Sequence, residues 1–195
     1  ILRRRGYWSI LLVSAVAEMV VVSVLFQLPV FTQQYSHEHA IYILNAFYLA
    51  GGLGGLTGGL IANFALSKSS GLMKAAAWFL MLMAFALVVF AICNNLWVRL
   101  MAMLVLDGSW IVVGTKCNMS LQLLVDNAYR GRALGVLLMG NIGLSPLAIL
   151  LVGIISEYVG VFLALILISF ILLIIAVWYL RMVPHFRQDL STALL

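Results

Sequence analysis

The chain has 195 residues, of which 65% are hydrophobic and only 9% are charged, and its mean hydropathy is +1.17. A soluble domain carries about a quarter charged residues, so this composition excludes one and indicates an integral membrane protein. The net charge of +5 comes from basic residues that lie in short gaps between apolar runs. Because these residues do not gather on one amphipathic face, the charge argues for membrane topology and against nucleic-acid binding.

Six apolar runs are long enough to cross a bilayer, which takes about 20 helical residues. The predicted spans are about 7–31, 40–64, 72–93, 96–125, 132–156 and 160–180. The chain is therefore expected to be a single all-α transmembrane domain of six helices, 1–195, with a tail over 181–195. Because it begins at Ile1 and not at a methionine, we expect it to be a piece of a longer protein.

Basic residues fall almost entirely on one side of the predicted bundle. That side would hold Arg3, Arg4, Arg5, Lys68, Lys74, Arg130, Arg132, Arg181 and Arg187. The opposite side would hold Arg99, with the acids Glu38 and Glu157. The positive-inside rule then predicts that both ends of the segment, including the tail, are cytoplasmic.

Three charged side chains lie inside predicted spans, where each charge costs about 2.5–3.5 kcal/mol on insertion scales. Glu18 is about 16 Å into the first span, and Asp107 reaches a similar depth in the fourth, which enters from the other side. Lys116 is about half a turn out of phase with Asp107, so we expect it to pair with Glu18 instead. A structural ion pair or a snorkelling side chain is the alternative role for all three. Four amides, which either line a cavity or join helices, are Gln27, Asn45, Asn118 and Asn141.

Glycines mark two spans for close helix packing. The second span contains Gly51-x3-Gly55-x3-Gly59 and Gly54-x3-Gly58, and the fifth contains Gly140, Gly143 and Pro146. In the second span the glycines predict either a sliding helix contact or a static one. The third and sixth spans are nearly all large aliphatic or aromatic residues, which predicts that they face lipid.

The connections suggest a latch but no metal site. Arg130 and Arg132 flank a glycine at the membrane surface and, with Asp126, are expected to form a cytoplasmic latch; lipid-headgroup contact is the alternative. The segment 37–39 reads His-Glu-His, which is usually an ordinary polar loop and not a metal site. Cys93 and Cys117 lack CxxC spacing and are expected to be free buried thiols. We expect no metal and no cofactor.

The chain also shows a weak internal repeat at an offset of 89 residues. The paired positions are Trp8 and Trp97, Glu18 and Asp107, Gly51 and Gly140, Gly54 and Gly143, Ser67 and Ser156, and Gly71 and Gly160. Spans one to three would then repeat as spans four to six. Because three is odd, the second copy enters from the opposite side, which predicts a 3+3 inverted repeat.

A pattern of charged residues, glycines and a proline runs through 122–153. It consists of Gln122, Val125, Asp126, Arg130, Gly131, Arg132 and Gly135, followed by Gly140, Gly143, Pro146 and Gly153. The pattern resembles the C-terminal half of major facilitator superfamily exporters, with the branch of enterobactin and macrolide exporters as the most similar. In that superfamily, the loop after the second helix of a half carries G-x-x-x-D-R-x-G-R-K. The aligned residues are Gly59, Asn63, Phe64, Leu66, Ser67 and Lys68, so only the glycine and the final lysine remain, as is typical of C-terminal halves.

The resemblance implies a function for the membrane acids. The first and fourth helices of such a half line a central cavity, so Glu18 and Asp107 would face the transport path near the midplane, with Lys116 nearby. Burial favours the neutral form of a carboxyl group, so one or both acids would take up a proton reversibly. The implied protein is a proton-coupled exporter of a small molecule in the bacterial inner membrane. Its partners would be the lipid bilayer and either a missing N-terminal six-helix half or a second copy.

Two kinds of intramembrane protease compete with a transporter as the function of this chain. An intramembrane serine protease built on Gly108-Ser109 would need a histidine in a later span, and the histidines at 37, 39 and 185 lie outside the spans. An aspartyl protease would need a second aspartate inside the spans, and Asp107 is the only aspartate within them. The sequence thus predicts that the chain is not an enzyme. A stand-alone six-helix module, either a channel or a substrate-binding subunit that acts as an oligomer, stays as the alternative.

Overall fold

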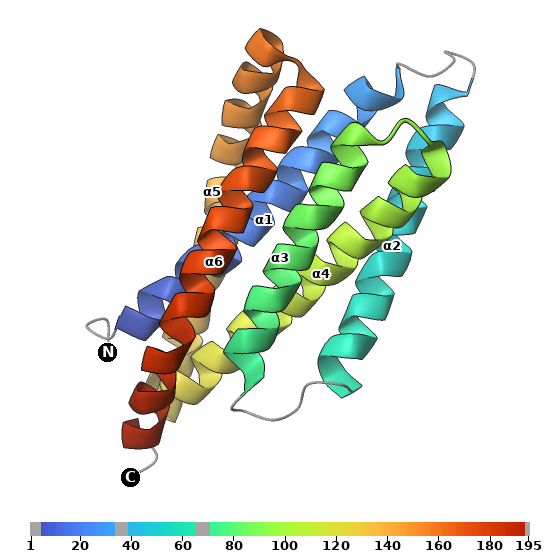
Figure 1. The fold of residues 1–195 in the computed structure, drawn as a ribbon. Helices are drawn as coiled ribbons and strands as arrows, with labels where there is room; N and C mark the ends of the chain where they lie inside the picture. The colour runs from blue at the N-terminus through green and yellow to red at the C-terminus, as the bar shows by residue number, and fades with distance from the viewer. Residues whose placement is uncertain (1–4, 34–38, 65–70, 194–195) are drawn as a thin grey trace.

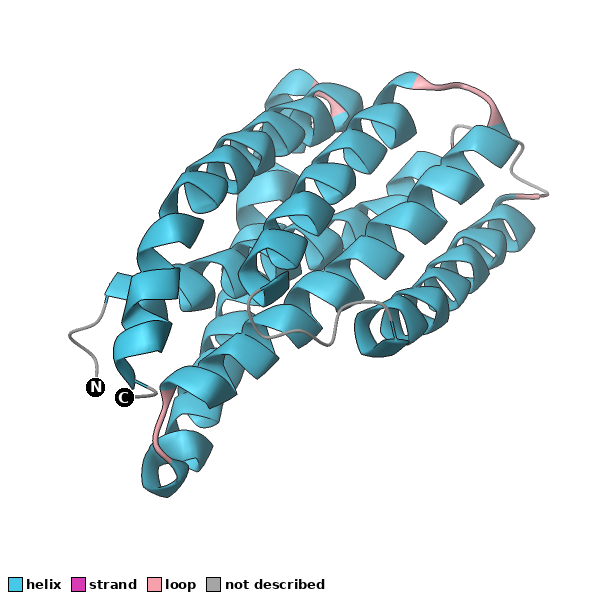
Figure 2. Cartoon of the chain, turned by 60° about the horizontal axis from the view of Figure 1, so that its bottom comes forward, coloured by secondary structure: helices cyan, strands magenta, loops and turns pink. Residues whose placement is uncertain are grey.

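The computed structural model describes residues 5–33, 39–64 and 71–193, and within them it contains helices and no strands. The helices are α1 (Arg5–Thr32), α2 (Ala40–Phe64), α3 (Leu72–Ile92), α4 (Leu96–Leu124), α5 (Arg130–Val159) and α6 (Val161–Ala193), with a 3-10 turn, η2, at Asn127–Tyr129 (Figure 1). Figure 2 shows the same bundle from another side, with short loops between long helices.

All six long helices contain a run long and apolar enough to cross a membrane. The predicted all-α membrane fold is therefore confirmed. The predicted tail begins where this apolar run of α6 ends, at Arg181, but α6 itself continues to Ala193.

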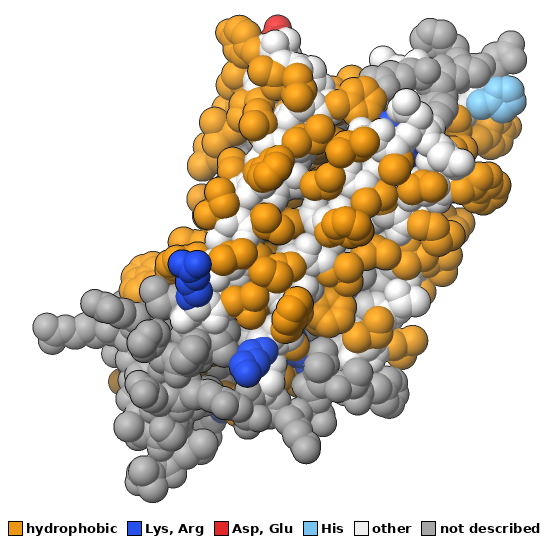
Figure 3. Space-filling model, in the orientation of Figure 1, with side chains coloured by type: hydrophobic (Ala, Val, Ile, Leu, Met, Phe, Trp, Pro, Cys, Tyr) orange, Lys and Arg blue, Asp and Glu red, His pale blue; other side chains and the backbone are white. Residues whose placement is uncertain are grey.

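The two ends of the bundle differ in charge. Both termini lie at the same end, as an even number of crossings requires (Figure 1). Figure 3 shows lysine and arginine side chains toward that end of the drawn face, an acidic side chain and a histidine at the other end, and hydrophobic side chains between them. A broad exposed apolar belt is unusual in water and is what a hydrocarbon solvent requires.

The core is built around α3, which packs along α4 and α6. Leu80, Met83 and Leu87 are fully buried, and 56% of the apolar span of α3 is buried. The expectation that the third span faces lipid is therefore wrong. Lipid tails are as apolar as a protein core, so an all-apolar helix carries no signal that separates a central position from a peripheral one. The sixth span, at 28% buried, fits the expected lipid-facing position much better.

Two pairs of helices complete the bundle: α1 packs along α5, and α4 packs along α2. If α1–α3 are related to α4–α6 by an in-plane two-fold axis, the α1–α5 contact is equivalent to the α4–α2 contact. Both contacts are present, as the inverted repeat predicts. In contrast to α3, the apolar spans of α2 and α5 are only 22% and 17% buried.

A buried arginine packs into an aromatic cluster at the end of the bundle opposite to the termini. Arg99, near the start of α4, is 3% exposed, and its guanidinium carbon lies 4.2 Å from the ring centre of Phe31 and 5.5 Å from that of Phe162. Phe31 of α1 also packs against Phe47 of α2 and Phe90 of α3. Sequence reasoning used Arg99 only to assign topology, because no sequence pattern shows that its side chain turns inward.

We expect Arg99→Leu to destabilise this end of the bundle by about 1–3 kcal/mol, since cation–π contacts without water contribute about 2 kcal/mol. The change is measured as a shift in the thermal unfolding temperature in detergent, where a dye that labels the buried Cys117 thiol reports unfolding. The stability of Arg99→Lys should lie between that of the wild-type protein and that of Arg99→Leu. The lysine ammonium keeps the charge but lacks the planar group that stacks on rings. Equal unfolding temperatures for all three proteins would contradict this role.

Candidate functional site

A polar pocket of about 240 Å³ lies between α1, α4 and α5. Its lining residues are Ser14, Glu18, Trp110, Ile111, Gly114, Thr115, Asn118, Leu137, Leu138 and Asn141. Hydroxyl, amide and carboxylate groups thus gather inside a helix bundle that is otherwise almost wholly apolar. Polar groups in membrane helices are unfavourable unless they face a cavity or one another, so this pocket is the candidate site.

Two hydrogen bonds tie the pocket walls together. Trp110 of α4 donates its indole N–H to Oε2 of Glu18 on α1, at 3.0 Å. Asn141 of α5 donates its amide N–H to the Ser14 hydroxyl oxygen, also at 3.0 Å. Glu18 is half-buried and keeps its carboxylate at the pocket surface.

Of the residues predicted as site candidates, the structure brings Glu18, Asn118 and Asn141 together in this pocket. Sequence reasoning missed Ser14 and Trp110, among others. The spacing of polar residues along each helix was a signal for them. Ser14 lies four residues before Glu18 on α1, and Trp110 lies eight residues before Asn118 on the same side of α4. Reading polar residues by helical spacing, and not singly, would have found the group.

Asp107 lies elsewhere, at the contact between α4 and α2. Its carboxylate packs against Gly51, where any β-carbon would overlap with Oδ2. The side chain is 7% exposed, and Oδ1 has no hydrogen-bond partner among the described residues. Glu18 and Asp107, which the 89-residue repeat pairs in the sequence, thus have different surroundings, because one faces a pocket and the other a closed helix contact.

Lys116 caps a helix. Its side chain is fully buried, and Nζ donates a hydrogen bond of 2.7 Å to the carbonyl oxygen of Ala62 in the last turn of α2. Carbonyls in a last helical turn lack intrahelical donors, and a cation there also suits the helix dipole. The expected pair between Lys116 and Glu18 is therefore wrong, since Glu18 bonds to Trp110 on a different face of α4.

The other two predicted amides do not line the pocket. Gln27 of α1 donates its amide N–H to the Ser156 hydroxyl oxygen of α5 at 2.9 Å, so it joins helices. Asn45 is exposed on α2.

The two arginines after α4 stabilise the turn itself. Arg130 Nη2 donates to the Gln122 carbonyl oxygen at 3.1 Å, which caps the last turn of α4. The Arg132 guanidinium lies 6.0 Å from the Tyr129 ring centre. In the described part of the chain neither arginine pairs with the exposed Asp126 carboxylate, so the predicted latch lacks its acidic partner.

Glycines form the α2–α4 contact, but only three of the five predicted ones take part in it. A β-carbon on Gly54 would overlap with the Leu104 carbonyl oxygen, and one on Gly58 with the Gly108 carbonyl oxygen. Gly51 meets Asp107, whereas Gly55 has only an ordinary contact of 3.7 Å and Gly59 faces open space. The face is thus 51-54-58, because spacings of three and four alternate along one side of a helix.

The glycines of α5 are not packed within this bundle. A β-carbon on Gly140 or Gly143 would meet no atom within 4 Å, and Pro146 is exposed inside the helix. The expectation that these residues mediate close packing is therefore wrong for the contacts inside this chain.

The repeat itself has a different register on these two helices. Phe47, Gly58 and Ala62 of α2 are buried, and so are the residues 90 positions later, Leu137, Ala148 and Val152. The residues 89 positions later, Val136, Leu147 and Leu151, are exposed. One residue turns a helix by about 100°, so Asn141, and not Gly140, takes the place of Gly51. A polar amide beside Ser14 thus replaces a close glycine contact.

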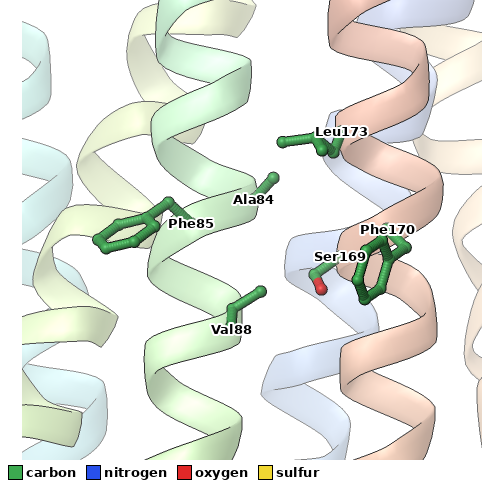
Figure 4. Close-up of a pocket in the computed structure, with 6 residues that line it drawn as sticks. All are labelled: Ala84, Phe85, Val88, Ser169, Phe170 and Leu173. Carbon is green, nitrogen blue, oxygen red and sulfur yellow. The ribbon is translucent and has the colours of Figure 1, made fainter.

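A second pocket, between α3 and α6, is apolar. It has a volume of about 100 Å³ and is lined by Ala84, Phe85, Val88, Ser169, Phe170 and Leu173 (Figure 4). The Ser169 hydroxyl donates to the Ile166 carbonyl oxygen of its own helix at 2.6 Å, so it is already satisfied. With no charged lining group, this pocket offers no chemistry comparable to that around Glu18.

The residues that the structure describes contain no group of three potential metal ligands. His37 and Glu38 lie outside the described residues, which begin again at His39. Cys93 and Cys117 are free thiols, and Cys117 is buried whereas Cys93 is half-buried.

A family model described as transmembrane secretion effector, of the major facilitator type, matches residues 5–193. No curated protein sequence matches the chain. The family match covers every helix of the bundle, and it does not distinguish the enterobactin and macrolide branch from others.

Proposed function

The chain belongs to the transmembrane secretion effector family of major facilitator transporters, and we propose that it works as half of a proton-coupled exporter. In this proposal a small molecule crosses the membrane by alternating access, and the pocket between α1, α4 and α5 is part of its path. The family consists of transporters, which favours transport over catalysis.

The observation that carries the proposal is the half-buried Glu18 carboxylate in a polar pocket inside the membrane span. An intramembrane acid is unfavourable by a few kcal/mol and marks substrate or proton pathways. Asp107, buried at the related position of the second repeat, is the second proton-binding group in this proposal.

The same proposal places the protein in a bacterial inner membrane with both ends of this segment in the cytoplasm. The gathering of lysine and arginine near the end that holds both termini supports this orientation.

A partner of six more helices completes the pathway. The apolar spans of α2 and α5 are the least buried of the six, and the unpacked Gly140 and Gly143 lie on α5. We assign these surfaces to an N-terminal half of the same protein, with a second copy of this segment as the alternative.

The test uses the full-length protein in cells, with a panel of cationic, neutral and anionic fluorescent compounds. Export of at least one compound should stop when an uncoupler removes the proton gradient. Glu18→Gln with Asp107→Asn should lose this uncoupler-sensitive export by about tenfold or more, the size of effect that a lost acid–base group produces. Undiminished export by the double variant would overturn the proton-coupling proposal.

A further inference from the structure

Among the residues that the structure describes, Glu18 is the only charged side chain that lines the pocket. The other lining residues contribute two hydroxyls, two amides, an indole and aliphatic groups, with no lysine, arginine or histidine among them. The charge of the pocket is therefore negative whenever Glu18 is ionised.

No basic side chain in the described part of the chain neutralises this acid. Lys116 points to the last turn of α2, and Arg130 caps α4. The hydrogen-bond donor on Glu18 is the neutral Trp110 indole, which contacts Oε2. An intramembrane carboxylate without a cationic partner attracts a cation from the solution.

Trp110 supplies the second element of a cation site. The Trp110 ring lines the pocket, and its indole N–H donates a hydrogen bond that holds the Glu18 carboxylate in place. Tryptophan is the aromatic side chain that binds organic cations most strongly, through the negative face of its ring. Aliphatic walls from Ile111 and Leu137 suit an apolar group attached to the charge.

Building on the proposed transport function, we propose that the pocket between α1, α4 and α5 binds an organic cation that carries an apolar or aromatic group. Glu18 is its counter-ion, and the Trp110 ring is the wall against which the cation lies. The exposed amide of Asn118 provides a hydrogen-bond acceptor for a polar substituent.

The test measures binding and not transport. Full-length protein in phosphatidylcholine nanodiscs is dialysed against radiolabelled benzyltrimethylammonium, and against benzenesulfonate as an anion with a similar ring. Empty nanodiscs give the background. We expect saturable binding of the cation, at least tenfold weaker in Glu18→Gln, which corresponds to about 1.4 kcal/mol or more.

Glu157→Gln is the matched control, because it makes the same change at an exposed glutamate of α5 that does not line the pocket. It should leave the affinity for the cation within about twofold. Trp110→Phe keeps a ring and should weaken binding less than Trp110→Leu. These variants keep the test informative if Glu18→Gln does not fold.

Three results would overturn the inference: no saturable cation binding by the wild-type protein, equal binding by Glu18→Gln, or tighter binding of benzenesulfonate. Uncoupler-sensitive export of anionic or neutral compounds alone would also overturn it while leaving the transport proposal intact. Conversely, cation binding that depends on Glu18, together with undiminished export by the double variant, would overturn only proton coupling.

Discussion

Replacing Gly54 or Gly58 with alanine is expected to lower the unfolding free energy by about 1–3 kcal/mol, as overpacking of a close contact does. The added β-carbon would overlap with the carbonyl oxygen of Leu104 or of Gly108, and both are backbone atoms that cannot rotate away. Helix α2 would have to move off α4 along its length. The loss of stability is measured by thermal unfolding in detergent, in a Cys93→Ser background. Dye labelling of the Cys117 thiol reports unfolding.

The same helix provides the controls. A β-carbon on Gly52 or Gly59 meets nothing within 4 Å. Alanine at these positions should leave stability unchanged or raise it by up to about 1 kcal/mol, because alanine favours a helix over glycine. Equal destabilisation by all four substitutions would show that helix flexibility, and not the α2–α4 contact, is what the glycines provide.

Lys116→Ala is expected to destabilise the protein by about 2–5 kcal/mol. The Ala62 carbonyl would lose its donor inside the bundle, which costs about 1–3 kcal/mol, and removal of a fully buried side chain adds a cavity. The measurement is the same thiol-labelling assay, with limited proteolysis at the end of α2 as a second readout.

Two further substitutions separate the causes. Lys116→Met keeps most of the volume and should show mainly the loss of the cap. Lys74→Ala removes a lysine that is exposed on α3 and should change little. If Lys116→Met were as stable as the wild-type protein, packing and not capping would account for the role of Lys116.

Sequence patterns identified the six spans because a bilayer demands about 20 apolar residues from each helix, whatever its neighbours are. They identified the resemblance to the major facilitator superfamily, and a family model of that type matches residues 5–193. They also identified Glu18 and Asp107, since an acidic residue in an apolar span is recognisable whichever way its side chain points.

The spacing of residues along one helix did not determine which side chains point into the bundle and which point out of it. Glu18 and Asp107 sit at equivalent positions of the repeat, yet only Glu18 lines a pocket. The repeat offset of 89 was wrong by one residue for α2 and α5, and one residue is enough to turn Gly140 away and bring Asn141 to Ser14.

The sequence by itself therefore determined the membrane fold, the number of crossings and the family, because these depend on composition and length along the chain. The tertiary structure decided that α3 is central, that Gly54 and Gly58 rather than Gly55 and Gly59 form the close contact, and that Lys116 caps a helix. In a membrane, apolar residues face lipid and core alike, so only the packing of the helices against one another separates the two.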